Sequence, residues 1–171
     1  MIELQTGRLR LREFSEGDLE SLVRLDAGET TRGFAWEGGR NRRSVERSLR
    51  RWLAEYPRGF GQLAMIHRED DALIGHCGLE PSRDDGALLS YALSKDYWCK
   101  GLVPEACRAV LRYGFGELGL EEIWTATSPD NRAWRSMMER LGMELREEET
   151  RGEEAVVRYA LAREKFLALR T

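Results

Sequence analysis

The sequence predicts one α/β domain, residues 1–171, with a mixed and mostly antiparallel sheet of about seven strands and helices on both faces. Strand-like and helix-like apolar patterns succeed each other along the chain without a linker between them. One strand–helix–strand crossover is present, from Ala87 to Thr127, and it predicts a parallel pair in the middle of the sheet whose strands splay apart. Short turns join most other neighbouring strands, which makes them antiparallel.

The first third of the chain predicts one strand and two helices. Leu9 and Leu11 alternate with arginines, which is typical of a half-exposed strand. Ser15 is expected to cap the first helix and Ser44 the second. The stretch from Gly28 to Arg43 has no periodicity and is predicted to be a loop. The stripe of the second helix contains Val45, Leu49, Trp52, Leu53 and Tyr56.

The remaining elements follow from apolar runs separated by turn residues. Strands are predicted at Phe60–His67, Ala72–Leu79, Ala87–Leu93 and Ile123–Thr127. A helix begins near Pro104 and Gly119 ends it, and another follows Ser128 and ends at Gly142. The chain then predicts a hairpin of Met143–Thr150 and Ala155–Ala162, followed by a helical turn over Glu164–Arg170.

The junction between the third of these strands and the following helix predicts an anion site. The loop Tyr97–Val103 contains Lys100 and Gly101 and opens directly onto the helix. The first amides of a helix lack intrahelical partners, and the helix dipole adds partial positive charge there. A phosphate group is the ligand that such a junction favours, although an ordinary strand-to-helix turn has the same local pattern.

Composition excludes several classes of protein. The net charge of −3 argues against a general nucleic-acid binder, and no apolar run approaches the roughly 20 residues of a membrane span. The chain has 3 cysteines without CxxC spacing and 2 histidines, so we expect reduced thiols, a cytoplasmic location and no metal. The arginine-rich stretch from Arg40 to Arg51 is interpreted as a solvated helix face, with an acidic protein or ribosomal RNA as the minority alternative.

The order of elements and several motifs resemble the GNAT superfamily of acyl-CoA N-acyltransferases, nearly from end to end. The branch that it resembles includes ribosomal-protein N-terminal acetyltransferases and their small-molecule relatives. The motifs that carry this resemblance are Thr6–Arg12 with Gly17–Leu19, Ile74–Leu79, Tyr91–Leu93 with Trp98–Ala106, Asn131 with Glu139–Met143, and Arg158–Leu161.

The resemblance implies acetyl-CoA as co-substrate and a primary amine as acceptor, with direct attack in a ternary complex and no metal. It implies that the diphosphate lies at the loop and that the pantetheine arm pairs with the backbone of the Tyr91–Leu93 strand where the neighbouring strand diverges. The coenzyme-binding residues that it implies are Tyr91, Ala92, Leu93, Trp98, Cys99, Lys100, Gly101, Leu102, Val103 and Asn131. The acceptor is expected to contact Phe34 and Trp36.

The catalytic groups depart from the family pattern. Leu88 stands where many relatives carry a glutamate base, and Trp134 and Met138 stand where relatives carry a serine or tyrosine acid. Glu80 and His76, acting through water, and Ser136 are the substitutes that the sequence offers. Transfer by positioning alone, with water as the base, is a further possibility.

Two functions therefore stay open. The first is an acetyl-CoA-dependent N-acetyltransferase for a protein N-terminus or a small-molecule amine. The second is a coenzyme A-binding module with weakened or lost catalysis that acts as a sensor or regulatory partner. The sequence lacks GxGxxG and the P-loop pattern, which discounts other nucleotides. A homodimer formed through the C-terminal hairpin is plausible, and no membrane or nucleic-acid partner is expected.

Overall fold

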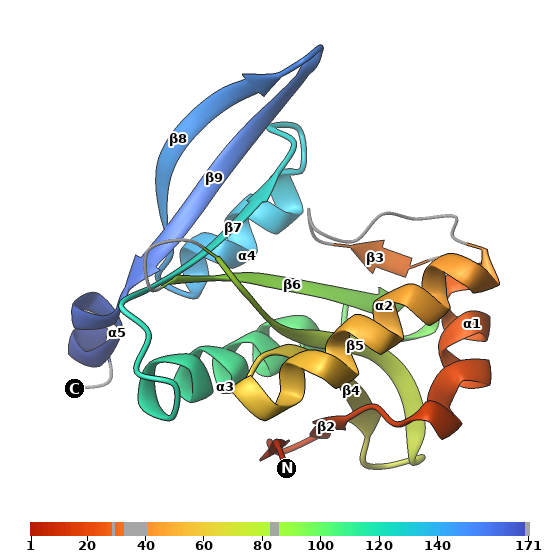
Figure 1. Ribbon diagram of the computed structural model, residues 1–171. Helices are drawn as coiled ribbons and strands as arrows, with labels where there is room; N and C mark the ends of the chain where they lie inside the picture. The colour runs from red at the N-terminus through yellow and green to blue at the C-terminus, as the bar shows by residue number, and fades with distance from the viewer. Residues whose placement is uncertain (29, 33–40, 83–85, 170–171) are drawn as a thin grey trace.

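A computed structural model describes residues 1–28, 30–32, 41–82 and 86–169 of the 171-residue chain. Within these residues, nine strands form one sheet that five α-helices accompany (Figure 1). The strands are β1 (Glu3–Gln5), β2 (Leu9–Glu13), β3 (Thr30–Arg32), β4 (Gly61–His67), β5 (Ala72–Pro81), β6 (Gly86–Ser94), β7 (Glu122–Thr127), β8 (Glu144–Arg151) and β9 (Glu154–Ala162). The helices are α1 (Leu19–Ala27), α2 (Arg42–Glu55), α3 (Leu102–Gly116), α4 (Arg132–Arg140) and α5 (Arg163–Leu169), with short 3₁₀ turns at Glu16–Asp18, Tyr56–Arg58 and Lys95–Tyr97.

The sheet runs in the order β1-β2-β4-β5-β6-β7-β9-β8, and β3 pairs with β6 off this path. All described pairs are antiparallel except β6 and β7, which α3 connects. This parallel pair is short: its register joins residues 86–88 to residues 122–124 and then stops, although both strands continue. The sheet therefore opens in its middle, as the sequence predicts.

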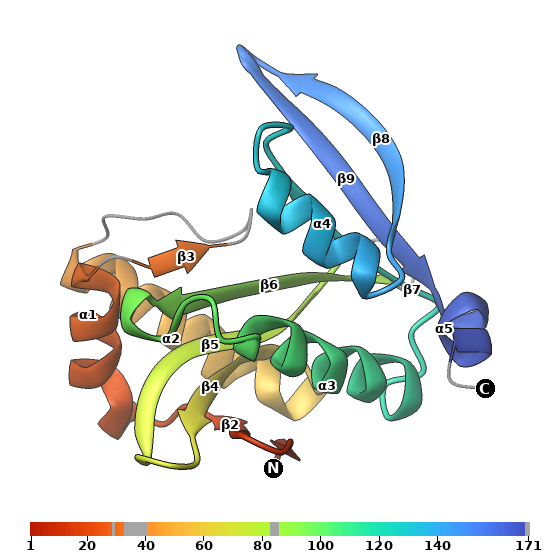
Figure 2. The same ribbon diagram turned by 180° about the vertical axis from the view of Figure 1, so that it is seen from behind.

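Helices lie on both faces of the sheet. Figure 1 shows α2 in front of the central strands with α1 next to it, and Figure 2, from behind, shows α3 and α4 in front. Successive side chains of a strand point to opposite faces of the sheet, so each strand packs against the helices on both sides. On β5, His76 contacts Trp52 of α2, whereas the neighbouring Cys77 lies 4.0 Å, sulfur to sulfur, from Cys107 of α3. The β8–β9 hairpin projects beyond the rest of the molecule.

The predicted fold class is confirmed, and three details of the prediction are wrong. The sheet has nine described strands rather than about seven, because β1 and β3 are three residues long and too short to show a period. The predicted loop between Gly28 and Arg43 therefore contains a strand. Asn41, rather than Ser44, caps α2, since its Oδ1 accepts a hydrogen bond from the Ser44 amide.

Candidate functional site

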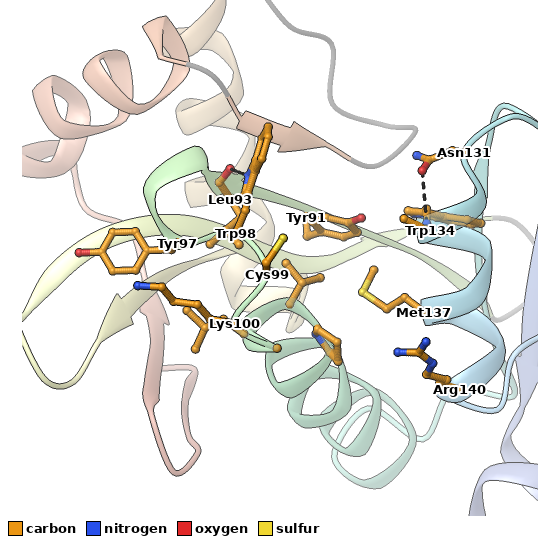
Figure 3. A pocket seen from close by; sticks show the side chains of 15 residues that line it. Tyr91, Leu93, Tyr97, Trp98, Cys99, Lys100, Asn131, Trp134, Met137 and Arg140 are labelled. Atoms are coloured by element: carbon orange, nitrogen blue, oxygen red, sulfur yellow. Dashed lines mark hydrogen bonds between the residues drawn. The ribbon is translucent and has the colours of Figure 1, made fainter.

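A cavity of about 330 Å³ lies where the end of β6, the first turn of α3 and one side of α4 meet. Figure 3 shows Tyr97 and Lys100 on one side of it, residues of α4 on the other, and Tyr91 and Cys99 between them. The residues that line it are Tyr91, Leu93, Tyr97–Pro104, Asn131, Ala133, Trp134, Met137 and Arg140. Almost the whole predicted coenzyme site is thus brought together, with Ala92 as its one member outside the lining.

The loop before α3 contains two residues in the left-handed backbone region. Cys99 and Gly101 both have positive φ angles, 63° and 75°, and Gly101 is the N-cap of α3. The loop is fastened to the end of β6 by a 3.0 Å hydrogen bond from Trp98 Nε1 to the carbonyl oxygen of Leu93. Because the first amides of a helix have no carbonyl behind them, this turn presents N–H donors at the wall of the cavity.

A cation and a phenol mark one end of the cavity. The Nζ of Lys100 lies 5.3 Å from the centroid of the Tyr97 ring. The Tyr97 hydroxyl donates a 2.6 Å hydrogen bond to Asp70 in the β4–β5 turn, and this bond raises the pKa of Tyr97. Tyr97 therefore stays neutral, and Lys100 adds the positive charge that suits a phosphate group.

Asn131, the residue before α4, marks the other end. Its Oδ1 accepts a hydrogen bond from the Trp134 amide at 3.3 Å (Figure 3), and its Nδ2 lies 3.4 Å from Thr127 Oγ1. Asn131 therefore caps α4, while it also lines the cavity.

Trp134 contributes a buried donor that has no acceptor among the described residues. Its side chain is 2% exposed, and its ring meets Tyr159 edge-on at 5.6 Å. Its Nε1 is buried without a hydrogen bond. Leaving such a group unpaired costs free energy, and the side chain that carries it is one of those that line the cavity.

The edge of β6 that faces the opening is only partly free. β5 pairs along one edge of β6, so β7 and β3 share the other edge. β7 pairs with residues 86–88 and β3 with residues 92–94, which leaves residues 89–91. The expectation that the backbone of Tyr91–Leu93 is open for pairing therefore needs correction at Ala92 and Leu93, because β3 occupies that position.

The predicted proton-transfer residues are not brought together with the cavity. His76 and Glu80 lie on the face of the sheet that α2 covers. His76 is 1% exposed and its Nδ1 lies 2.8 Å from Gln62 Oε1, whereas Glu80 pairs with Arg51 at 3.3 Å. Ser136 is half-buried on α4, outside the set of lining residues.

The places of the missing family groups are apolar in the structure as well. Leu88 is partly buried at the last pair that joins β6 to β7, and Met138 is buried in the core. Phe34 and Trp36, the predicted acceptor contacts, lie outside the described residues. In the described part of the chain, no cluster of side chains is suited to a metal ion, and no helix has the length and hydropathy needed to cross a membrane.

Sequence reasoning missed several residues of the site. Met137 and Arg140 line the cavity from α4, three residues apart on one side of the helix. That spacing was visible, but the apolar members of α4 also fit a core stripe. Arg8 was read only as the exposed half of a strand, whereas its Nη1 donates a 2.7 Å hydrogen bond to the carbonyl oxygen of Lys100.

Comparisons with known proteins agree with one another. The family described as acetyltransferase (GNAT) domain matches residues 8–144. The uncharacterized protein YkkB of Bacillus subtilis is 26% identical over 146 residues, which cover 82% of this chain and 84% of that protein. The GNAT-family acetyltransferase from Bacillus anthracis is similar in structure, with a TM-score of 0.79, 20% identity, and coverage of 95% of this chain and 99% of that one.

A third comparison concerns a structure solved with a ligand. The ribosomal L7/L12 alpha-N-protein acetyltransferase RimL in complex with coenzyme A has a TM-score of 0.80 and 13% identity, and the alignment covers 94% of this chain and 98% of that one. At this identity the likeness concerns the fold.

Proposed function

The chain belongs to the GNAT acetyltransferase family, and we propose that it is an acetyl-CoA-dependent N-acetyltransferase that acts on a primary amine. The acceptor class that we propose is a protein N-terminus or a small-molecule amine. The observation that carries the proposal is the cavity at the start of α3, because it combines the N-terminus of that helix and Lys100 at one end with Trp134 and other residues of α4 at the other.

Each end of the cavity suits one part of acetyl-CoA. The amides around Gly101 and the Lys100 ammonium suit the diphosphate. The free edge of β6 at residues 89–91 suits the peptide-like pantetheine arm, which places the thioester beside the opening between β6 and β7. The buried wall of Tyr91 and Trp134 excludes water from the thioester.

The proposed reaction is direct transfer in a ternary complex. The neutral amine attacks the thioester carbonyl, the new C–N bond forms, and the C–S bond breaks as coenzyme A leaves as a thiolate. The amine loses one proton to water. A tryptophan N–H donates hydrogen bonds but does not release its proton at neutral pH, so Trp134 stabilises a developing negative charge without acting as an acid.

A second function, a coenzyme A-binding module without turnover, draws support from the apolar residues at Leu88, Trp134 and Met138. A steady-state assay that detects free coenzyme A, with a panel of amines and N-terminal peptides, separates the two functions. The enzyme requires release that depends on the acceptor. Tight binding of acetyl-CoA with no release above hydrolysis for any acceptor would identify the module instead.

The site assignment has its own test in Gly101→Asp. A side chain at Gly101 would project toward Arg8, whose Nη2 lies 3.4 Å from the Cβ position, so the aspartate adds negative charge beside the diphosphate site and competes for that guanidinium. We expect it to weaken coenzyme A binding by about 30-fold in calorimetry. Gly101→Asn is the matched control, because asparagine has the same shape, tolerates the φ angle of 75° and carries no charge. Equal affinity of the folded aspartate variant and the wild type would contradict the assignment.

A further inference from the structure

Arg8 joins the start of the chain to the loop before α3. Its Nη1 donates to the carbonyl oxygen of Lys100 at 2.7 Å, and its Nε donates to Glu105 Oε1 at 2.9 Å. Its backbone amide donates to the other carboxylate oxygen of Glu105 at 3.0 Å. One side chain thus holds both a loop carbonyl and the first turn of the helix, across more than ninety residues of sequence.

The bond to Lys100 sets the direction of the next amide. The carbonyl of Lys100 and the N–H of Gly101 belong to one planar trans peptide unit, so they point in opposite directions. Lys100 and Gly101 line the cavity, whereas Arg8 does not. Drawing the carbonyl toward Arg8 therefore turns the Gly101 N–H toward the cavity. A Cβ on Gly101 would lie 3.4 Å from Arg8 Nη2, which places the guanidinium directly behind this residue.

Arg8 is itself held in place. Glu105 receives a 2.6 Å hydrogen bond from Thr6 Oγ1 in addition to the two from Arg8. Burial alone would raise the pKa of Glu105, but these hydrogen bonds outweigh it and hold the pKa below its ordinary value. The carboxylate therefore stays charged at neutral pH. Arg10, in β2 two residues beyond Arg8, has no recorded polar side-chain contact in the described part of the chain.

We infer that Arg8 is a positioning residue for the coenzyme: it holds the Lys100–Gly101 peptide so that the Gly101 N–H donates to the diphosphate. The inference rests on the proposed function. Arg8 acts through the peptide and does not contact the coenzyme. Its charge also polarises the peptide carbonyl, which strengthens the N–H as a donor.

The test compares donors with and without a diphosphate. Arg8→Gln is expected to raise the Kd for coenzyme A about tenfold in calorimetry and the KM for acetyl-CoA by a similar factor. The KM for S-acetylpantetheine, which lacks the diphosphate, is expected to stay within about twofold of the wild type. Arg10→Gln removes the same charge two residues further along the chain, in β2, and is expected to leave both values unchanged.

Two further variants separate orientation from charge. Arg8→Lys keeps the charge but lacks the planar fork that reaches Lys100 and Glu105 together. We therefore expect its Kd for coenzyme A to be raised nearly as much as in Arg8→Gln. Thr6→Val removes one anchor of Glu105 without changing any charge and is expected to raise the Kd about twofold to threefold. This milder variant gives the readout if Arg8→Gln does not fold.

Each outcome supports or overturns a named claim. A wild type that binds no coenzyme A refutes the proposed function and not merely the role of Arg8. If the wild type binds, three results overturn the inference: unchanged affinity in Arg8→Gln, equal losses for both donors, or wild-type affinity in Arg8→Lys. Unchanged affinity in Arg8→Gln means that Arg8 is not needed for binding. Equal losses for both donors mean that Arg8 acts on the fold, and wild-type affinity in Arg8→Lys means that only its charge matters.

Discussion

Trp134 shows how one buried atom reports on a ligand. Its indole N–H is enclosed without an acceptor among the described residues, and such an unpaired donor lowers the stability of the folded protein. Trp134→Phe keeps an aromatic ring against Tyr159 and removes only this donor and a little volume. We expect the affinity for coenzyme A to fall about fivefold while the unliganded protein unfolds at nearly the same temperature. Calorimetry and thermal unfolding give the two values.

Trp124→Phe is the matched control for that prediction. The Nε1 of Trp124 has an acceptor of its own, Ser82 Oγ at 3.0 Å, and its ring stacks on Arg158. Trp124→Phe removes this hydrogen bond, so it is expected to lower the free energy of unfolding by about 1 kcal/mol and to leave coenzyme affinity unchanged. If both substitutions changed the affinity for coenzyme A equally, the Trp134 N–H would have no specific role in binding.

At the scale of elements, two glycines predict opposite effects of the same substitution. On β5, a Cβ at Gly78 would lie 2.2 Å from the carbonyl oxygen of Gly61 and 2.7 Å from Gln62 Cα, both in the backbone of β4. Gly78→Ala must therefore push two paired strands apart and is expected to cost about 3 kcal/mol or more. At the end of α3, a Cβ on Gly116 meets nothing within 4 Å, so Gly116→Ala is expected to stabilise by about 0.5–1 kcal/mol.

Urea denaturation with a common slope measures both changes. A Gly78→Ala variant as stable as the wild type would mean that β4 and β5 are further apart than this register requires. A destabilised Gly116→Ala variant would mean that the end of α3 is not open to solvent.

The elements themselves were largely predictable from sequence, since each long one has its own apolar period. β3 was not, because its three residues are held by pairing with residues 92–94 of β6 rather than by a local pattern. Most of the cavity lining was predictable because the loop that forms it is contiguous, from Tyr97 to Val103, whereas its role in coenzyme binding stays a prediction. Arg8 and Arg140 were not, since their contribution depends on contacts that only the folded chain creates. The residues that transfer protons during acetyl transfer remain a prediction.

At the scale of the molecule, coenzyme A is expected to stabilise the whole domain by linkage, because the cavity exists only when β6, α3 and α4 are assembled. At a concentration of about 100 times Kd, the gain is about 2.7 kcal/mol, which for a chain of this size raises Tm by roughly 5–10 °C. A thermal scan with and without coenzyme A measures it. Gly101→Asp, with a Kd about 30-fold higher, is expected to keep about 0.9 kcal/mol of this gain at the same concentration, roughly a third of the wild-type shift. A wild type without a shift would contradict the site.

The short free stretch of β6 also determines how binding free energy is distributed along the ligand. Residues 89–91 offer room for only a few backbone hydrogen bonds, since β7 and β3 take the positions on either side. In the proposed complex, the thiol-bearing half of the coenzyme gains little from the sheet, and we expect the diphosphate-bearing nucleotide end to supply most of the attraction. Nucleotide-bearing resins, rather than thiol-reactive ones, are accordingly the rational choice for capturing this protein.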